Sequence, residues 1–360
     1  MTGMPKAGWG ILLMAVLASG IADAGAPVAH VHLLRRLLTT CAVLSVILAG
    51  AAAAAVSLGP YPISVRDLWA AAAGRAPEHI ARILFTVRLP RIALGALVGC
   101  ALSVAGGAFQ GMLMNPLADP YLIGVSSGAA LGASLAIVLN VSGAAGFGVP
   151  LAAFVVALLT MIIVYRLAQA RGKIGVESFI LAGVVVGSFM WALVTVIMTL
   201  AGRSLSEVIF WLMGNLFVEG WEPVALVLGA TIVGTVGLYA FARDLNLLAL
   251  GEETAQQLGA DVERLKRLVI VFGSLLTAAA VSFSGIIGFV GLVMPHIARK
   301  IVGPDHRVLL PAAGLIGASF LILADTVARV AGPWEMPVGV ITSILGAPFF
   351  LYLLRTRARP

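Results

Sequence analysis

The chain has 360 residues, of which 61% are hydrophobic and only 11% are charged, and its formal net charge is +7. Because so few polar side chains cannot cover a water-soluble protein of this length, the composition predicts an all-α integral membrane protein. In a soluble domain the positive charge would favour nucleic-acid binding. In a membrane protein it is explained by loops that face anionic lipid, so we expect no nucleic-acid partner.

The first 25 residues need a separate interpretation. Lys6, the apolar stretch 9–17 and the small residues 22–24 resemble a signal peptide with its cleavage site. Arg35 and Arg36 precede the first long apolar run and favour a start on the cytoplasmic side, which fits an uncleaved extension or an upstream start codon. We expect residues 1–34 to be an N-terminal extension and residues 35–360 to form a transmembrane domain, and cleavage within the first 25 residues stays open.

Runs of residues without a charge fill most of the transmembrane domain, at 37–65, 92–118, 120–165, 178–202, 223–242, 268–298, 308–324 and 336–354. A helix needs about 20 residues to cross a bilayer, so the 46-residue run 120–165 must hold two spans, whereas the 31-residue run 268–298 holds two only if the chain reverses tightly within it. Turn-forming residues divide both: Ser142, Gly143, Gly146, Gly148 and Pro150 in one, and Ser282, Ser284 and Gly285 in the other. The sequence therefore predicts about ten transmembrane helices.

The orientation follows from the Lys and Arg residues of alternate loops. One set of loops contains sixteen: Lys6, Arg35, Arg36, Arg166, Arg171, Lys173, Arg243, Arg264, Lys266, Arg267, Arg299, Lys300, Arg307, Arg355, Arg357 and Arg359. The other set contains seven: Arg66, Arg75, Arg82, Arg88, Arg91, Arg203 and Arg329. We expect both termini to be cytoplasmic, which agrees with an even number of spans.

The segment from Asn115 to Gly128 interrupts two apolar runs with the sequence Asn-Pro-Leu-Ala-Asp-Pro-Tyr-Leu-Ile-Gly-Val-Ser-Ser-Gly. Proline lacks a backbone donor and restricts the residue before it, so Asn115 and Pro116 should end a helix near the cytoplasmic face. This segment resembles the signature of the FecCD-type permeases of ABC importers, which carry iron-siderophores, haem or cobalamin. The resemblance extends over about residues 35–355, at 88–91, 251–259, 288–299, 305–311, 323–325, 337–342 and 346–348.

The resemblance implies a type II ABC importer permease that forms a homodimer and takes its substrate from an extracytoplasmic binding protein. The chain lacks the phosphate-binding Gly-x-x-x-x-Gly-Lys-Ser/Thr loop, since Gly172-Lys173 is followed by Ile174. We therefore expect no enzyme activity and no cofactor in this chain, with ATP bound by a separate ATPase subunit present in two copies.

The family relationship also implies two gate elements. Asn115 and Leu117 correspond to a cytoplasmic gate, for which an ordinary helix-capping turn is the alternative. The second element precedes the fifth span and corresponds to Val176 and Glu177 here. Members of the family usually have small hydroxyl residues at these positions, so the chemistry of this gate stays open.

Two further surfaces are implied. The loop 243–267 corresponds to the coupling loop that docks on the ATPase, with Glu252, Glu253 and Gln257 as polar contacts, and a solvated loop without a partner is the alternative. Arg75, Arg82 and Arg329 face the side from which a binding protein arrives. For Arg329 an ion pair with Asp325, one helical turn away, is the competing interpretation.

The predicted spans contain few groups that could bind a bare metal ion. Cys41 and Cys100 are isolated, a lone His296 is more often structural, and the methionines at 190, 198 and 213 are typical of packing. A metal chelate brings its own ligands, so we expect a ferric siderophore or haem as cargo, with cobalamin as the alternative. An ion-driven secondary transporter is a remote alternative, because it needs ionisable residues or broken helices near the midplane.

Overall fold

The structure is a computed structural model that describes residues 27–61, 63–141, 146–170, 173–332 and 334–357. The signal-like segment lies outside the described residues. Helices make up nearly all of the described structure: α2 (Pro27–Ser57), α3 (Val65–Ala72), α4 (Glu78–Arg82), η1 (Ile83–Arg88), α5 (Leu89–Met112), η2 (Pro120–Ile123), α6 (Val125–Val138), α7 (Gly148–Ala168), α8 (Val176–Leu200), η4 (Gly202–Ser204), α9 (Leu205–Leu212), α10 (Glu222–Ala240), α11 (Ala242–Leu248), α12 (Glu252–Gln257), α13 (Val262–Ser284), α14 (Val290–Val302), α15 (His306–Val330) and α16 (Val338–Arg357). The all-α membrane fold is confirmed.

Each of the ten predicted spans coincides with a helix, but they differ in length. Among the described residues, seven helical stretches are long and apolar enough to cross a membrane: α2, the run from α4 to α5, α7, α8, α10, α13 and α15. The other three predicted spans are α6, α14 and the apolar part of α16, Val338–Leu351. At 1.5 Å per residue, the 14 residues of α6 cover about 21 Å, less than the hydrocarbon core of about 30 Å.

The reversal predicted near Ser284 lies where the sequence placed it. Helix α13 ends at Ser284, and Gly285 follows with φ +64°, a conformation that favours glycine. A Cβ atom on Gly285 would also lie 2.2 Å from the backbone oxygen of Trp211, so a larger residue does not fit. Helix α14 then begins at Val290.

The second span begins earlier than the sequence predicted. Helix α4, the π-helical turn η1 and α5 form one continuous run from Glu78 to Met112. Pro90 lies inside this run and has no N–H to donate, which frees a carbonyl in the preceding turn. The carbonyl of Thr86 instead accepts from the N–H of Gly220 at 2.9 Å. Arg88 and Arg91, which the charge count grouped with loop residues, therefore lie in a helix.

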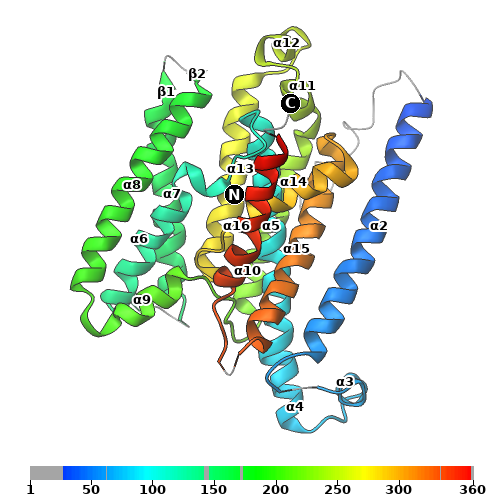
Figure 1. The fold of residues 1–360 in the computed structure, drawn as a ribbon, viewed down its shortest axis with the longest axis vertical. Coiled ribbons are helices and arrows are strands. Elements are labelled where there is room, and N and C mark those ends of the chain that lie inside the picture. Colours follow the sequence, from blue (N-terminus) through cyan, green and yellow to red (C-terminus); the bar gives the residue numbers. More distant parts are fainter. Residues whose placement is uncertain (1–26, 62, 142–145, 171–172, 333, 358–360) are drawn as a thin grey trace, which may run out of the picture.

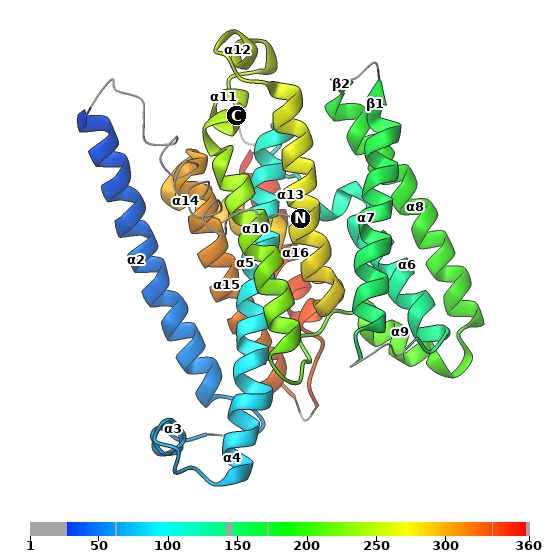
Figure 2. The ribbon, with the colours of Figure 1, turned by 180° about the vertical axis from the view of Figure 1, so that it is seen from behind.

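Helix α5 lies at the centre of the fold. Most of its residues are buried, and it packs against α15, α13, α14 and α10. Figure 1 shows α6, α7, α8 and α9 grouped on one side of it, while α2 lies on the other side against α15. The view from behind, in Figure 2, shows the same order. The central position of α5 places its carboxyl end, where the predicted break begins, inside the helix bundle.

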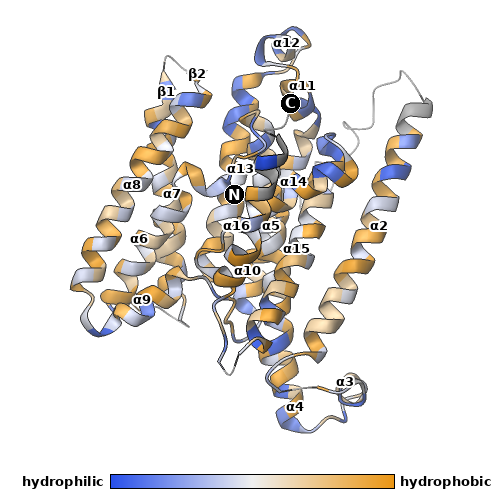
Figure 3. Cartoon of the chain, viewed as in Figure 1, coloured by the Kyte–Doolittle hydropathy of each residue, from blue (hydrophilic) through white to orange (hydrophobic). Residues whose placement is uncertain are grey.

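The molecule has two polar ends separated by an apolar zone. Figure 3 shows hydrophilic residues concentrated near α11 and α12 at one end and near α3 and α4 at the other. We call these ends the α12 pole and the α4 pole. The strands β1 (Gln169–Ala170) and β2 (Lys173–Ile174) form an antiparallel hairpin at the α12 pole, where α2 begins and α16 ends (Figure 1).

Candidate functional site

The break after α5 consists of two consecutive turns, each capped by a side chain. Met114 has φ +48°, and the Oδ1 atom of Asn115 accepts the N–H of Leu117 at 3.0 Å. Asp119 repeats the arrangement, since its Oδ1 accepts the N–H of Tyr121 at 2.8 Å. Asn and Asp favour such turns because their short side chains bond to the backbone two residues on. The helix break predicted at Asn115 is present, and the chain re-enters the bundle as α6.

Hydrogen bonds attach this break to the corner between α13 and α14. The hydroxyl of Tyr121 accepts the N–H of Ile287 at 3.3 Å. From the end of α5, the side-chain amide of Gln110 donates to the carbonyl of Leu292 at 3.0 Å and accepts from Arg299 at 3.1 Å. The break and the end of α5 are therefore fixed to α14 and to the loop that precedes it, and a movement of α14 would act on them directly.

The second expected gate element lies at the start of α8. Val176 and Glu177 are the first two residues of this helix, with Val176 half-buried and Glu177 exposed. The contact between α8 and the break occurs two turns further along, at Gly183. A Cβ atom there would lie 2.7 Å from the carbonyl oxygen of Leu122. The two predicted gate elements thus lie on neighbouring segments that pack against each other through a glycine.

The coupling loop predicted at 243–267 contains α11 and α12 and forms the tip of the α12 pole (Figures 1 and 2). Two of the three predicted contact residues, Glu253 and Gln257, are exposed and lie four residues apart on one face of α12. The adjacent Leu250 and Leu258 are 62% and 57% exposed. An exposed apolar pair with polar neighbours has the composition of a protein-docking surface.

The third predicted contact, Glu252, turns toward the protein. Its Oε1 atom lies 2.7 Å from Nζ of Lys266, a side chain that is only 2% exposed. The same Nζ donates to the carbonyl of Ile174 at 3.0 Å and lies 3.6 Å from a carboxylate oxygen of Glu263. Glu263 in turn accepts the N–H of Ile174 at 3.0 Å. Lys266 therefore connects α12 and α13 to the hairpin that ends just before Val176.

Sequence reasoning counted Lys266 only as a loop cation and missed this role. The periodicity of α13 contained a signal for it. Val262 and Val269 are buried, and Lys266 lies four residues after the first and three before the second, on the same helical face. A lysine on the buried face of an amphipathic helix requires a partner for its charge.

Helix α11 is attached to the start of α15 by a second polar cluster. The side chain of Asn246 donates to Asp305 at 2.7 Å and accepts the backbone N–H of His306 at 2.9 Å. Burial disfavours the charge of Asp305, but hydrogen bonds from Arg307 and Asn246 outweigh it and hold the pKa of this carboxyl below its usual value. Asp305 is thus an anionic anchor for the coupling loop.

At the α4 pole the structure separates the three predicted docking arginines. Arg75 and Arg82 are exposed, near α4. Arg329 is only 5% exposed, so its prediction as an accessible cation is wrong. Its Nε lies 3.1 Å from Asp325 one turn earlier, and its two terminal nitrogens donate to the carbonyls of Leu58 and Ala55 at 3.2 Å. Its guanidinium attaches the end of α2 to α15.

Arg329 belongs to a larger buried network that joins the second and ninth predicted spans. Arg91 makes a bidentate contact with Asp325, its Nη2 at 2.9 Å and its Nε at 3.1 Å, and reaches Glu335 with Nη1 at 2.7 Å. Arg88 donates to the carbonyls of Val56 and Tyr61 at 2.7 Å. Asp325 thus compensates two arginines, and sequence analysis considered only the local one.

The described residues contain no group of three or more His, Cys, Asp or Glu side chains that could hold a metal ion. Cys41 and Cys100 lie on different helices as free thiols, and His296 is a buried residue of α14. Together the loops, the break and the buried networks describe a membrane scaffold with an exposed docking tip.

Comparisons with known proteins agree with this description. Residues 32–356 match the FecCD transport family. The chain is 48% identical to the cobalamin import system permease protein of Halobacterium salinarum, over 78% of this chain and 75% of the relative. It is 40% identical to the hemin transport system permease protein of Yersinia pestis, over 83% of this chain and 89% of the relative.

A solved structure described as an inward-facing metal-chelate type ABC transporter has a similar fold. Its TM-score is 0.78 at 31% sequence identity, and the match covers 89% of this chain and 99% of that chain. Permeases of this family hold no cofactor, and ATP is bound by a partner ATPase. This chain belongs to the FecCD transport family and is the non-catalytic, multi-pass permease subunit of an ABC importer for iron chelates, haem or cobalamin.

Proposed function

We propose that this permease imports a cobalamin-type corrinoid, with an iron chelate as the second candidate. The relative named for cobalamin is 48% identical and the relative named for hemin is 40% identical, which reverses the order favoured by sequence analysis. Both candidates are bulky chelates that bring their own metal ligands. The lack of a clustered ligand set among the described residues supports a chelate over a bare ion.

We propose that the α12 pole faces the cytoplasm and docks on the ATPase. The positive-inside count places the loops of this pole inside, together with both termini. Glu253 and Gln257 would provide the polar contacts, and Leu250 and Leu258 the apolar ones. Glu252 acts from the inner side of α12 through Lys266. The exposed tip of α12 is the observation that carries this assignment.

We further propose that the permease acts as a homodimer with two ATPase subunits, and that residues 35–360 form one transmembrane domain. Helices α8 and α16 present apolar faces to the outside: Leu181 is 65% exposed, Phe189 61%, Ile344 62% and Leu351 63%. If these faces pair in the homodimer, the substrate pathway would run between the two permease subunits. Asn115, Leu117, Val176 and Glu177 would then form the gate at the α12 pole.

At the opposite pole we propose that Arg75 and Arg82 meet carboxylates of the extracytoplasmic binding protein. Exposed charges of this kind mainly raise the association rate and make it sensitive to salt. Arg329 is left out of this surface, because its guanidinium is occupied by Asp325 and by backbone carbonyls.

The proposed cargo is tested by uptake into proteoliposomes that contain the permease, its ATPase and its binding protein. Cobalamin, a ferric siderophore, haem and unchelated iron are compared in the presence of ATP. We expect ATP-dependent accumulation of cobalamin, and a permease without its ATPase provides the control. Accumulation of a ferric chelate alone would assign the second candidate, whereas accumulation of unchelated iron alone would overturn the chelate proposal.

A further inference from the structure

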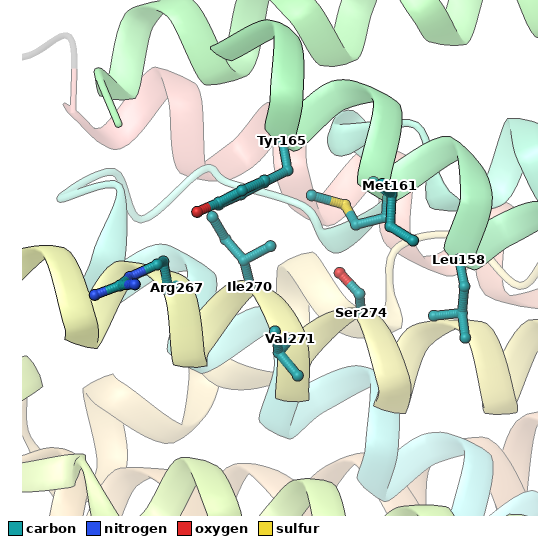
Figure 4. A pocket seen from close by; sticks show the side chains of 8 residues that line it. Leu158, Met161, Tyr165, Arg267, Ile270, Val271 and Ser274 are labelled. Carbon is teal, nitrogen blue, oxygen red and sulfur yellow. The ribbon is translucent and has the colours of Figure 1, made fainter. Parts of the chain in front are cut away.

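A groove with a volume of about 420 Å³ lies between α7 and α13 (Figure 4). Its walls are almost entirely apolar. Three polar side chains interrupt them: Tyr165 and Arg267 at one end, and Ser274 deeper in the wall. The lining consists of Leu158, Met161, Ile162, Tyr165, Arg267, Ile270, Val271 and Ser274.

The groove opens toward the surface that the bilayer covers. Both of its helices are long enough to span a membrane. Its rims are formed by Ile162 and Val271, which are 54% and 57% exposed, while its floor is formed by Met161 and Ile270, which are 4% and 3% exposed. A ligand of this groove would therefore enter from the hydrocarbon phase, which favours an acyl chain over a water-soluble molecule.

The end of the groove nearest the α12 pole is cationic. Figure 4 shows the guanidinium of Arg267 and the hydroxyl of Tyr165 at the same end of the groove. Within the described part of the chain, the one hydrogen bond of Arg267 goes to the backbone oxygen of Glu263 at 3.3 Å, and it forms no ion pair. Two further exposed arginines, Arg264 and Arg166, lie close by in sequence on the same two helices.

Two acidic residues at the start of α13 are already engaged. The Glu263 carboxylate faces Lys266 and the N–H of Ile174, while Asp261 accepts the N–H of Arg264 as the cap of α13. The positive charge of Arg267 at the mouth is therefore left without a carboxylate partner among the described residues. An anionic group at this position would supply one.

A third polar group lies deeper, inside the apolar part of the wall. Ser274 is 2% exposed, and its hydroxyl has no hydrogen-bond partner among the described residues. A buried hydroxyl normally bonds to an acceptor. Figure 4 shows this oxygen directed toward the space between α7 and α13. A ligand with an acceptor oxygen below its charged head would satisfy it, as the ester carbonyls of a phospholipid do.

We propose that this groove binds one anionic phospholipid, with its phosphate at Arg267 and Tyr165 and an acyl chain along Ile270, Met161 and Leu158. The free energy of an acyl chain changes little when it moves from the bilayer into the groove, because the neighbouring lipid tails are as apolar as the groove wall. The charge of the headgroup must therefore provide the selectivity, as in other basic pockets between membrane helices. The proposal holds for any cargo and for either orientation of the chain.

The role of the headgroup charge in binding is tested by native mass spectrometry. The purified full-length chain is titrated with phosphatidylglycerol or with phosphatidylcholine. We expect one phosphatidylglycerol to bind several times more tightly than phosphatidylcholine. Arg267→Gln should weaken the binding of phosphatidylglycerol about fivefold, as expected for one cation near an anionic headgroup, and should weaken the binding of zwitterionic phosphatidylcholine less. Lys300→Gln, at an exposed cation on α14, provides the matched control and should change neither.

The position is tested by filling the groove. Ile162→Trp places a large ring in the groove from its rim, whereas Leu159→Trp adds the same ring to α7 at a residue that is 52% exposed and does not line the groove. Only the first variant should lose the tightly bound lipid. Equal binding of both lipids by the wild type, or retention of the lipid by Ile162→Trp, would overturn the proposal.

Two further outcomes identify another occupant and also overturn it. Displacement of the bound species by glycerol phosphate alone would show that the site recognises a free phosphate and not a lipid. Loss of self-association in Ile162→Trp, but not in Leu159→Trp, would assign the groove to a second copy of this chain. Thermal unfolding of each variant verifies that it is folded before binding is measured.

Discussion

The Nζ atom of Lys266 lies 2.7 Å from Oε1 of Glu252 and 3.0 Å from the carbonyl oxygen of Ile174. One buried cation therefore joins the helix proposed to dock on the ATPase to the hairpin that leads into α8. Because Ile174 is two residues before Val176, a displacement of α12 would be transmitted to the predicted gate through a single side chain. This contact is a physical route between the two proposed surfaces.

Replacing Lys266 with methionine should uncouple ATP hydrolysis from uptake. The variant leaves the buried carbonyl of Ile174 without a donor and should lower the free energy of unfolding by about 1–3 kcal/mol. Glu252 is one-third exposed, so water can hydrate its carboxylate in the variant. The lost ion pair should therefore add little to this loss of stability. The assembled complex should hydrolyse ATP at a near-normal rate while uptake per ATP falls. Recovery with Lys266→Arg would support coupling through the charge, and unchanged uptake in Lys266→Met would contradict it.

Glu253→Arg should weaken the complex with the ATPase without affecting the fold. Glu253 is exposed at the tip of α12, and in the described structure no ion pair holds it. A charge reversal there should reduce the amount of ATPase that co-purifies with the permease, and should reduce uptake in parallel. Glu219→Arg reverses an exposed charge at the other pole and should leave the ATPase bound. Full recovery of ATPase with Glu253→Arg would remove α12 from the docking surface.

The sequence predicted those features of the fold that depend on neighbouring residues. Asn115 and Pro116 break a helix by their own chemistry, and Gly285 permits the positive φ that ends α13. The apolar runs likewise predict where the membrane helices lie, because they too are a local property of the sequence. Their lengths were less predictable, because α6 is limited by the turns that flank it and not by its composition.

The buried networks could not be predicted in this way, because their partners lie far apart in the chain. Arg91 and Asp325 are separated by 234 residues, and no local pattern indicates that they meet. The sequence around Arg329 showed only the nearby Asp325. Which side of α15 faces the end of α2 depends on the packing of the whole bundle, so the burial of Arg329 became visible only in the structure.

Asp325→Asn should destabilise the protein more than any of the surface variants. Its carboxylate contacts two arginines, and the Arg91 and Asp325 side chains are 9% and 3% exposed. Removal of one partner of a buried ion pair typically costs about 3–5 kcal/mol, because the remaining charge is uncompensated. Thermal unfolding in detergent measures the loss. Glu335→Gln provides the control: its side chain is 44% exposed, so we expect at most about 1 kcal/mol, and equal losses for both variants would contradict a buried network.

The proposed orientation predicts which loops react with a membrane-impermeant thiol reagent. In a background with Cys41 and Cys100 replaced by alanine, single cysteines at Leu250 and Trp334 report on the two poles. These positions are suitable because the wild-type side chains are 62% and 77% exposed. Leu250→Cys lies at the α12 pole and should react only after the cell is opened, whereas Trp334→Cys follows α15 at the α4 pole and should react in intact cells.

The physical reason is the distribution of charge. The loops of the α12 pole contain most of the Lys and Arg residues, and such loops stay on the cytoplasmic side. The reverse pattern would place the coupling tip outside, where no ATPase could reach it, and reaction of both cysteines in intact cells would contradict the separation of the poles by a membrane.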